Sequence, residues 1–174
     1  MAVGALLAIA AGMYASAEVW PARQKLLAMP SLDRPWIEWL RRNSDPSSPI
    51  LCLPFPMGST VGDYERTSLF MLEQIGHRRP MVGGYSGFFP PEFLRLKSMM
   101  EGFPDDAVMA ELRSRGVSHV VVADAAWAAH ADRSPSLRLA FHDENAKVKV
   151  KVKVKVKVYK VLPPPIDYER FFNP

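Results

Sequence analysis

The segment from Gly83 to Gly87 comes closer than any other in this sequence to a phosphate-binding or catalytic loop. It follows a short apolar run, as glycine-rich phosphate loops follow a strand, but it lacks the Walker lysine and the dinucleotide-binding spacing. Ser86 has Gly84 two residues before it, whereas Phe88 stands where the nucleophile-elbow motif needs a glycine. The pattern favours a turn with positive φ and leaves open a loop that lines a ligand-binding cleft.

The histidines form no i, i+4 metal-binding pair; they are His77, His119, His130 and His142. His77 adjoins Arg78 and Arg79, a group that suits either an anionic ligand or simple capping of the preceding helix. A hydrolase that pairs Ser86 with His77 or His119 is the least favoured hypothesis. We expect no catalytic residue, no metal site and no cofactor. The candidate ligand-binding residues are Tyr64, His77, Arg78, Gly83, Gly84, Tyr85 and Ser86.

Short strands alternate with helices around these residues. Buried apolar runs predict strands at 50–53, 80–82 and 117–122. Apolar spacing and capping residues predict helices at 34–43, 63–76, 91–100 and 104–115. We place the N-caps of the first two helices at Asp33 and Asp63, and a C-cap at Gly76. The alternation predicts a small, three-layer-like α/β domain that ends in an antiparallel β-hairpin.

A perfect Lys-Val repeat occupies residues 147–158. Valine on one face and lysine on the other is the pattern of a half-buried strand, and residues 143–146 suit a hairpin turn back to 136–142. We interpret the repeat as an expansion of a short edge strand, with a basic patch on anionic lipid as the alternative. If five pairs are surplus, the net charge of +4 falls by five to −1. The excess positive charge therefore comes from the repeat alone, and we expect no nucleic-acid binding.

Residues 1–17 carry no charged side chain. About 20 apolar residues span a bilayer, so extension to Trp20 makes residues 1–20 a candidate transmembrane helix, the last span of a longer protein. A signal peptide is the alternative, because Ala15-Ser-Ala17 matches a cleavage site, although no basic residue precedes the apolar run. A linker with an amphipathic helix (21–49), the α/β domain (50–162) and a proline-rich tail (163–174) follow. The single cysteine, Cys52, is expected to be a small core residue.

An ordered set of segments carries a family resemblance: 36–40, 50–54, 64–80, 82–87 and 103–122. Together they resemble the C-terminal soluble tail of bacterial polytopic membrane proteins of the GT-C glycosyltransferase type. That resemblance implies a parent enzyme dependent on lipid-phosphate sugars, with a catalytic acidic residue in an early extracytoplasmic loop that this sequence lacks.

We therefore expect a non-catalytic extracytoplasmic domain fragment at the cell membrane, with a supporting or acceptor-binding role. Its expected partners are the lipid bilayer and the other membrane helices of the parent protein. A secreted α/β binding domain with a signal peptide is the alternative.

Overall fold

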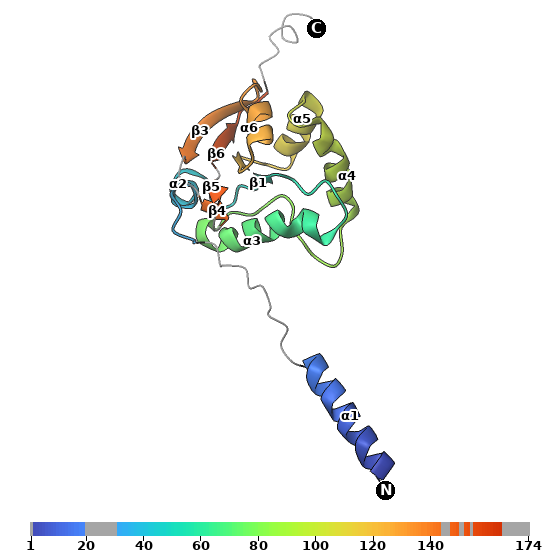
Figure 1. Ribbon diagram of the computed structural model, residues 1–174. Coiled ribbons are helices and arrows are strands. Elements are labelled where there is room, and N and C mark those ends of the chain that lie inside the picture. The colour runs from blue at the N-terminus through green and yellow to red at the C-terminus, as the bar shows by residue number, and fades with distance from the viewer. Residues whose placement is uncertain (1, 20–30, 144–146, 150–151, 154, 165–174) are drawn as a thin grey trace, which may run out of the picture.

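A four-stranded mixed sheet forms the centre of the domain in the computed structural model (Figure 1). The structure describes residues 2–19, 31–143, 147–149, 152–153 and 155–164. The strands lie in the order β1 (Ile50–Leu53), β2 (His119–Val122), β6 (Val156–Val161) and β3 (Leu137–Asp143). β1 and β2 run parallel, and β6 is antiparallel to both of its neighbours. The predicted C-terminal hairpin is therefore confirmed, but its second strand is inside the sheet and β3 forms the edge.

Helices cover both faces of this sheet, which confirms the predicted layered α/β fold. One face carries α4 (Pro91–Met99), α5 (Asp106–Ser114) and α6 (Ala125–Ala131). The other carries α2 (Pro35–Asn43) and α3 (Glu65–His77). The alternation of side chains along each strand sends successive residues to the two layers.

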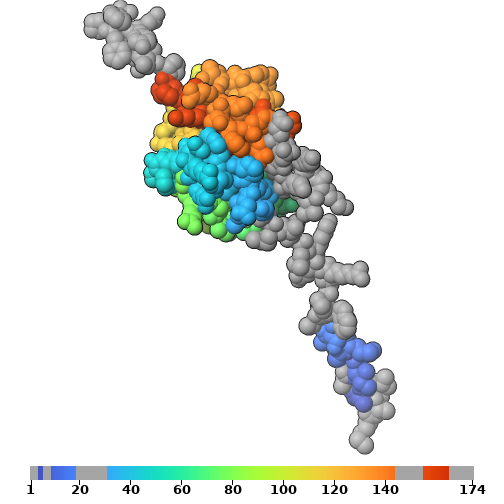
Figure 2. Space-filling view, turned by 90° about the vertical axis from the view of Figure 1, so that its left-hand side faces the viewer, coloured from blue at the N-terminus to red at the C-terminus, as the bar shows by residue number. Residues whose placement is uncertain are grey.

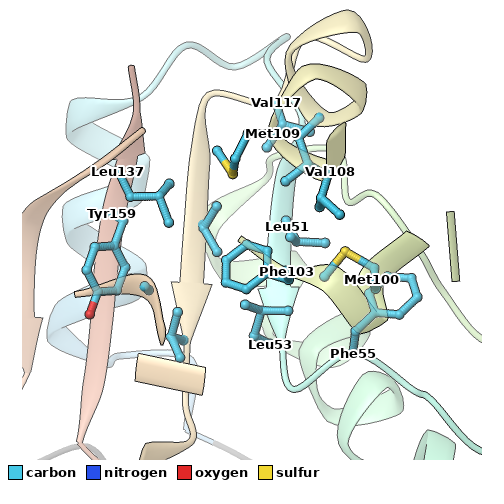
Figure 3. Packing of buried hydrophobic residues seen from close by; sticks show 14 of the residues in the cluster. Leu51, Leu53, Phe55, Met100, Phe103, Val108, Met109, Val117, Leu137 and Tyr159 are labelled. Carbon is cyan, nitrogen blue, oxygen red and sulfur yellow. The ribbon is translucent and has the colours of Figure 1, made fainter. Parts of the chain in front are cut away.

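β1 shows how one strand serves both layers. Leu51 and Leu53 are fully buried and pack with Phe103 and Met100 beneath α4 and α5 (Figure 3). Cys52 points to the opposite face and belongs to the cluster beneath α2 and α3. Burial raises the pKa of its thiol well above the usual range. The expectation that Cys52 is a small core residue is therefore confirmed.

α2 closes the second layer over the edge of the sheet. Figure 2 shows this face, with blue α2 below the orange residues of β3. Trp39 of α2 stacks on Phe141 of β3 with ring centroids 5.7 Å apart, and it meets His119 edge-on at the same distance. His119 is thus a packed core histidine.

Two helix boundaries differ from the predictions. Arg34, not Asp33, is the N-cap of α2, and the guanidinium of Arg34 instead pairs with Glu73. Asp63 lies in the 3₁₀ helix η1 (Val61–Tyr64), where it forms a capping box with Thr60 before α3 begins. These are corrections of position, since the predicted helices themselves exist.

Gly76 does not end α3, which continues to His77. A Cβ atom at Gly76 would lie only 2.7 Å from Cγ2 of Ile37, so this glycine permits the close approach of α2. Arg78 takes the left-handed C-cap position instead, with φ of 57°. The predicted strand at 80–82 is reduced to a single bridge between Met81 and Ile50.

α1 (Ala2–Val19) is the N-terminal helix. Ile9, Met13 and Tyr14 are 61%, 67% and 69% exposed. Nowhere in the described part of the chain is a helix long and apolar enough to cross a membrane. The predicted transmembrane helix over residues 1–20 is therefore not supported. Residues 21–30 of the predicted linker, and the tail from residue 165 onward, lie outside the described residues.

The Lys-Val repeat does not form one long strand, which corrects the prediction for 147–158. Lys147–Lys149 (β4) and Val152–Lys153 (β5) pair with each other in a separate two-stranded sheet. β6 takes only the last part of the repeat, and Val156 and Val158 there are 1% and 0% exposed.

Asp132 fixes the register of β6. Its carboxylate accepts hydrogen bonds from Nζ of Lys157 at 2.6 Å and from the hydroxyl of Tyr159 at 2.7 Å. Asp143 pairs with Val156, so residues 144–155 form the connection between two adjacent strands of one hairpin. The sheet therefore needs only the end of the repeat.

Deletion of residues 147–154, four Lys-Val pairs, is expected to leave the free energy of unfolding within about 1 kcal/mol of the parent value. The connection would shorten to four residues, a common hairpin length, and loop closure would become about 1 kcal/mol less costly. Urea unfolding followed by circular dichroism measures the change. The matched control is Val158→Ala, which truncates a buried valine of the same repeat and should cost on the order of 2 kcal/mol. Loss of the folded state on deletion would contradict this account.

Candidate functional site

Five aromatic rings form a continuous stack from the core to the surface. We call them the aromatic series: Phe55, Phe93, Phe89, Tyr64 and Tyr85. Successive ring centroids along this order are 5.7, 5.1, 5.1 and 5.2 Å apart. Such separations are those of favourable aromatic pairs. The rings come from the segment after β1, from η1, from the loop before α4 and from α4 itself, so four parts of the chain meet here.

The aromatic series is buried at one end and open at the other. Phe55 and Tyr64 are each 4% exposed, whereas Tyr85 is 41% exposed. Phe88, in the same loop, is 72% exposed, and Leu94 on α4 is 52% exposed. A scaffold with a rigid inner end thus presents aromatic side chains to solvent.

Lys97 of α4 holds the ring of Tyr64 in place. Its ammonium lies 5.3 Å from the ring centroid, within the range of a cation–π contact, and 3.1 Å from the Tyr64 hydroxyl. The same ammonium donates to the carbonyl of Gly58. These contacts put a positive charge beside the aromatic series.

The loop from Gly83 to Ser86 positions Tyr85. Gly83 has φ of 105°, and a Cβ atom there would lie 3.2 Å from Cε2 of Phe55, so both the conformation and the space favour glycine. The backbone N–H of Tyr85 lies 3.2 Å from the sulfur of Met71 on α3. The prediction of a turn with positive φ is confirmed at Gly83.

Ser86 is part of a local turn rather than of a catalytic arrangement. Its hydroxyl donates to the carbonyl of Phe88 and accepts from the backbone N–H of the same residue at 3.2 Å. Neither His77 nor His119 bonds to Ser86 in the described contacts. The structure therefore gives no support to a serine hydrolase.

The structure divides the predicted site between the two ends of α3. Tyr64, Gly83, Tyr85 and their loop neighbours meet at its N-terminal end. His77 and Arg78 lie at its C-terminal end, about 20 Å away at 1.5 Å per residue. His77 is 0% exposed and packs on Trp36, whereas Arg78 is exposed and its backbone N–H bonds to the carbonyl of Gln74.

Sequence reasoning missed the residues that connect the aromatic series: Phe55, Phe89, Phe93 and Lys97. The signal present was local, since Phe88, Phe89 and Phe93 follow the Gly83–Ser86 loop within one short segment. Among the described residues, no group of histidine, cysteine and carboxylate side chains could hold a metal ion. The surface at Tyr85 offers exposed ring faces, with the Lys97 ammonium beside the next ring of the series.

No protein-family model, curated protein or solved structure matches this chain.

Proposed function

We propose that this chain is the soluble extracytoplasmic domain of a membrane glycosyltransferase-like protein and that it binds the acceptor saccharide without catalysing transfer. The sequence resemblance supplies the parent class. The aromatic series supports the binding role, because the apolar faces of sugar rings pack against exposed aromatic rings whose positions are fixed.

One observation carries the binding role: Tyr85 is 41% exposed yet its ring lies 5.2 Å from the buried ring of Tyr64. A ring held from behind loses little conformational freedom when a ligand covers its outer face. Phe88 extends the exposed aromatic surface beside it. A polar contact would come from the half-buried Lys97 ammonium, which lies 3.1 Å from the hydroxyl of Tyr64.

The test is titration of the ¹⁵N-labelled full chain with soluble hexasaccharides of mannose, glucose and N-acetylglucosamine. At least one saccharide should shift the backbone amide signals of Gly83, Gly84 and Tyr85 in a saturable manner. Tyr85→Ala should weaken that binding by about tenfold or more, which corresponds to the loss of a central aromatic contact.

The matched control is Tyr14→Ala, which removes another exposed tyrosine, on α1. This variant should bind the saccharide as the parent does. Equal weakening by both substitutions would locate binding elsewhere. Absence of any saturable shift at the Gly83–Ser86 loop with all three saccharides would refute the acceptor-binding role.

A further inference from the structure

Trp36 and His77 bury polar atoms that lack hydrogen-bond partners at the interface of α2 and α3. Their side chains are 1% and 0% exposed, and their ring centroids are 6.0 Å apart. Nε1 of Trp36 and Nε2 of His77 have no hydrogen-bond partner. Buried polar groups nearly always have one, so this pair requires an explanation.

Both unpartnered atoms are donors. The indole nitrogen of Trp36 can only donate. Nδ1 of His77 accepts from the backbone N–H of Arg79 at 3.1 Å, so the proton of the neutral ring is on Nε2. Burial, with a smaller effect from the Arg79 charge, lowers the pKa of His77 to about 4, and the ring is neutral at pH 7. The two neighbouring rings therefore bury two N–H groups for which no protein atom acts as acceptor.

The same interface carries an excess of buried positive charge. Arg79 is 4% exposed, and its five side-chain hydrogen bonds go to backbone carbonyls and the hydroxyl of Ser44 rather than to a carboxylate. Arg66 also leaves Nε and Nη1 buried without partners. Arg34 alone has a carboxylate partner here, Glu73, at 2.7 Å.

Oε2 of Glu73, on α3, is a buried acceptor that also lacks a hydrogen-bond partner. Its other carboxylate oxygen is held by Arg34, which fixes the orientation of the group. Among the described side chains of α2 and α3, buried N–H groups without a partner therefore outnumber this one oxygen: those of Trp36 and His77 and the two of Arg66. The species that would satisfy this set accepts hydrogen bonds, brings negative charge and is small enough to lie between two helices.

We propose that the interface of α2 and α3 binds a small monovalent anion, with Nε1–H of Trp36 and Nε2–H of His77 as its donors. Arg79, which contacts His77 and has no carboxylate among its hydrogen-bond partners, supplies a buried positive charge beside the site. The site lies at the opposite end of α3 from Tyr85 and is independent of saccharide binding.

Chloride titration of the full chain tests the proposal, with potassium gluconate replacing potassium chloride so that ionic strength stays constant. Tm should rise saturably by about 3 °C, because an anion that binds only the folded state stabilises it. Trp36→Phe keeps an aromatic ring but removes one donor, so it should abolish the chloride dependence. The matched control Trp39→Phe, on the same helix, should retain it.

Identical Tm values in chloride and gluconate would overturn the proposal and leave the two donors to water. Full chloride dependence in Trp36→Phe would overturn it as well. If Trp36→Phe does not fold, anomalous diffraction from bromide-soaked crystals of the unmodified protein tests the site instead. An anomalous peak within hydrogen-bond reach of both nitrogens is expected, and its absence there would refute the site.

Discussion

Replacement of Glu73 by alanine is expected to lower the free energy of unfolding by about 3–5 kcal/mol. Oε1 of Glu73 accepts from Nη1 of Arg34 at 2.7 Å, and the two side chains are only 1% and 9% exposed. The positive charges of Arg34 and Arg66 both act on this carboxylate. Truncation would leave buried guanidinium groups without a counter-charge. Urea unfolding of the parent and the variant, followed by circular dichroism, measures the difference.

The surface pair of Glu38 and Arg41 is the matched control for this prediction. Its charged atoms are 2.5 Å apart, but the side chains are 35% and 53% exposed. Glu38→Ala should cost at most about 1 kcal/mol, because water screens the pair. If Glu73→Ala is no more costly than Glu38→Ala, the pair of Arg34 and Glu73 is not the buried contact described above.

A double variant separates loss of the charge pair from loss of packing. Arg34→Met with Glu73→Leu replaces both charges by apolar side chains of similar length. Such replacements are often neutral or stabilising, so this variant should recover most of the stability that Glu73→Ala loses. Failure to recover would assign the cost to side-chain packing or to the charge of Arg66, which this variant leaves in place.

The sequence predicts the fold well where the apolar periodicity of a segment and the prolines at its boundaries indicate the same element. The strand at 50–53 is bounded by prolines and is found at those residues. The helix predicted at 91–100 begins at Pro91 and ends one residue early, at Met99. In both places the apolar residues that the local pattern singles out are also the ones that the core buries, because residue spacing determines which face of the element is apolar.

Tertiary contacts explain the boundaries that differ. Asp33 is a good capping residue, but Arg34 takes the N-cap because its side chain is needed beside Glu73. Gly76 resembles a C-cap in the sequence, whereas the approach of Ile37 explains why it is glycine. α6 escaped prediction although Asp124 caps it at the backbone N–H groups of Ala126 and Trp127, a signal that the sequence does contain.

The candidate site shows the limit of reasoning from neighbours in the chain. His77 is only six residues from Gly83, and the sequence suggested that they meet. The chain instead turns back after α3, bridges Ile50 at Met81, reaches Met71 at the middle of the helix, and meets Tyr64 at its N-terminal end. Long-range packing of this kind has no local signature, which is why Phe55 was not expected in one aromatic series with Tyr85.

Acidification from pH 7 to pH 4 is expected to lower the free energy of unfolding by several kcal/mol through His77 and His119. Burial is the main cause that lowers the pKa of each to about 4, from an ordinary value of 6.5. Between these two pH values the unfolded chain binds more protons than the folded chain, so stability falls as pH falls. The loss is on the order of 3 kcal/mol per histidine and saturates below about pH 4. Glu73, whose pKa burial raises, opposes part of it.

Urea unfolding at pH 7.0, 6.0, 5.0 and 4.5 tests this pH dependence and assigns it to residues. His77→Gln and His119→Gln each remove one titrating group, so the stability of either variant should depend less steeply on pH than that of the parent. His130→Gln alters an exposed histidine on α6. The free energy of unfolding of this variant should depend on pH as steeply as that of the parent. A parent whose stability is constant from pH 7.0 to pH 4.5 would show that the two rings are not held neutral in the folded core. Equal slopes in all three variants would assign the effect to other groups, such as Asp132, whose pKa the hydrogen bond from Lys157 lowers.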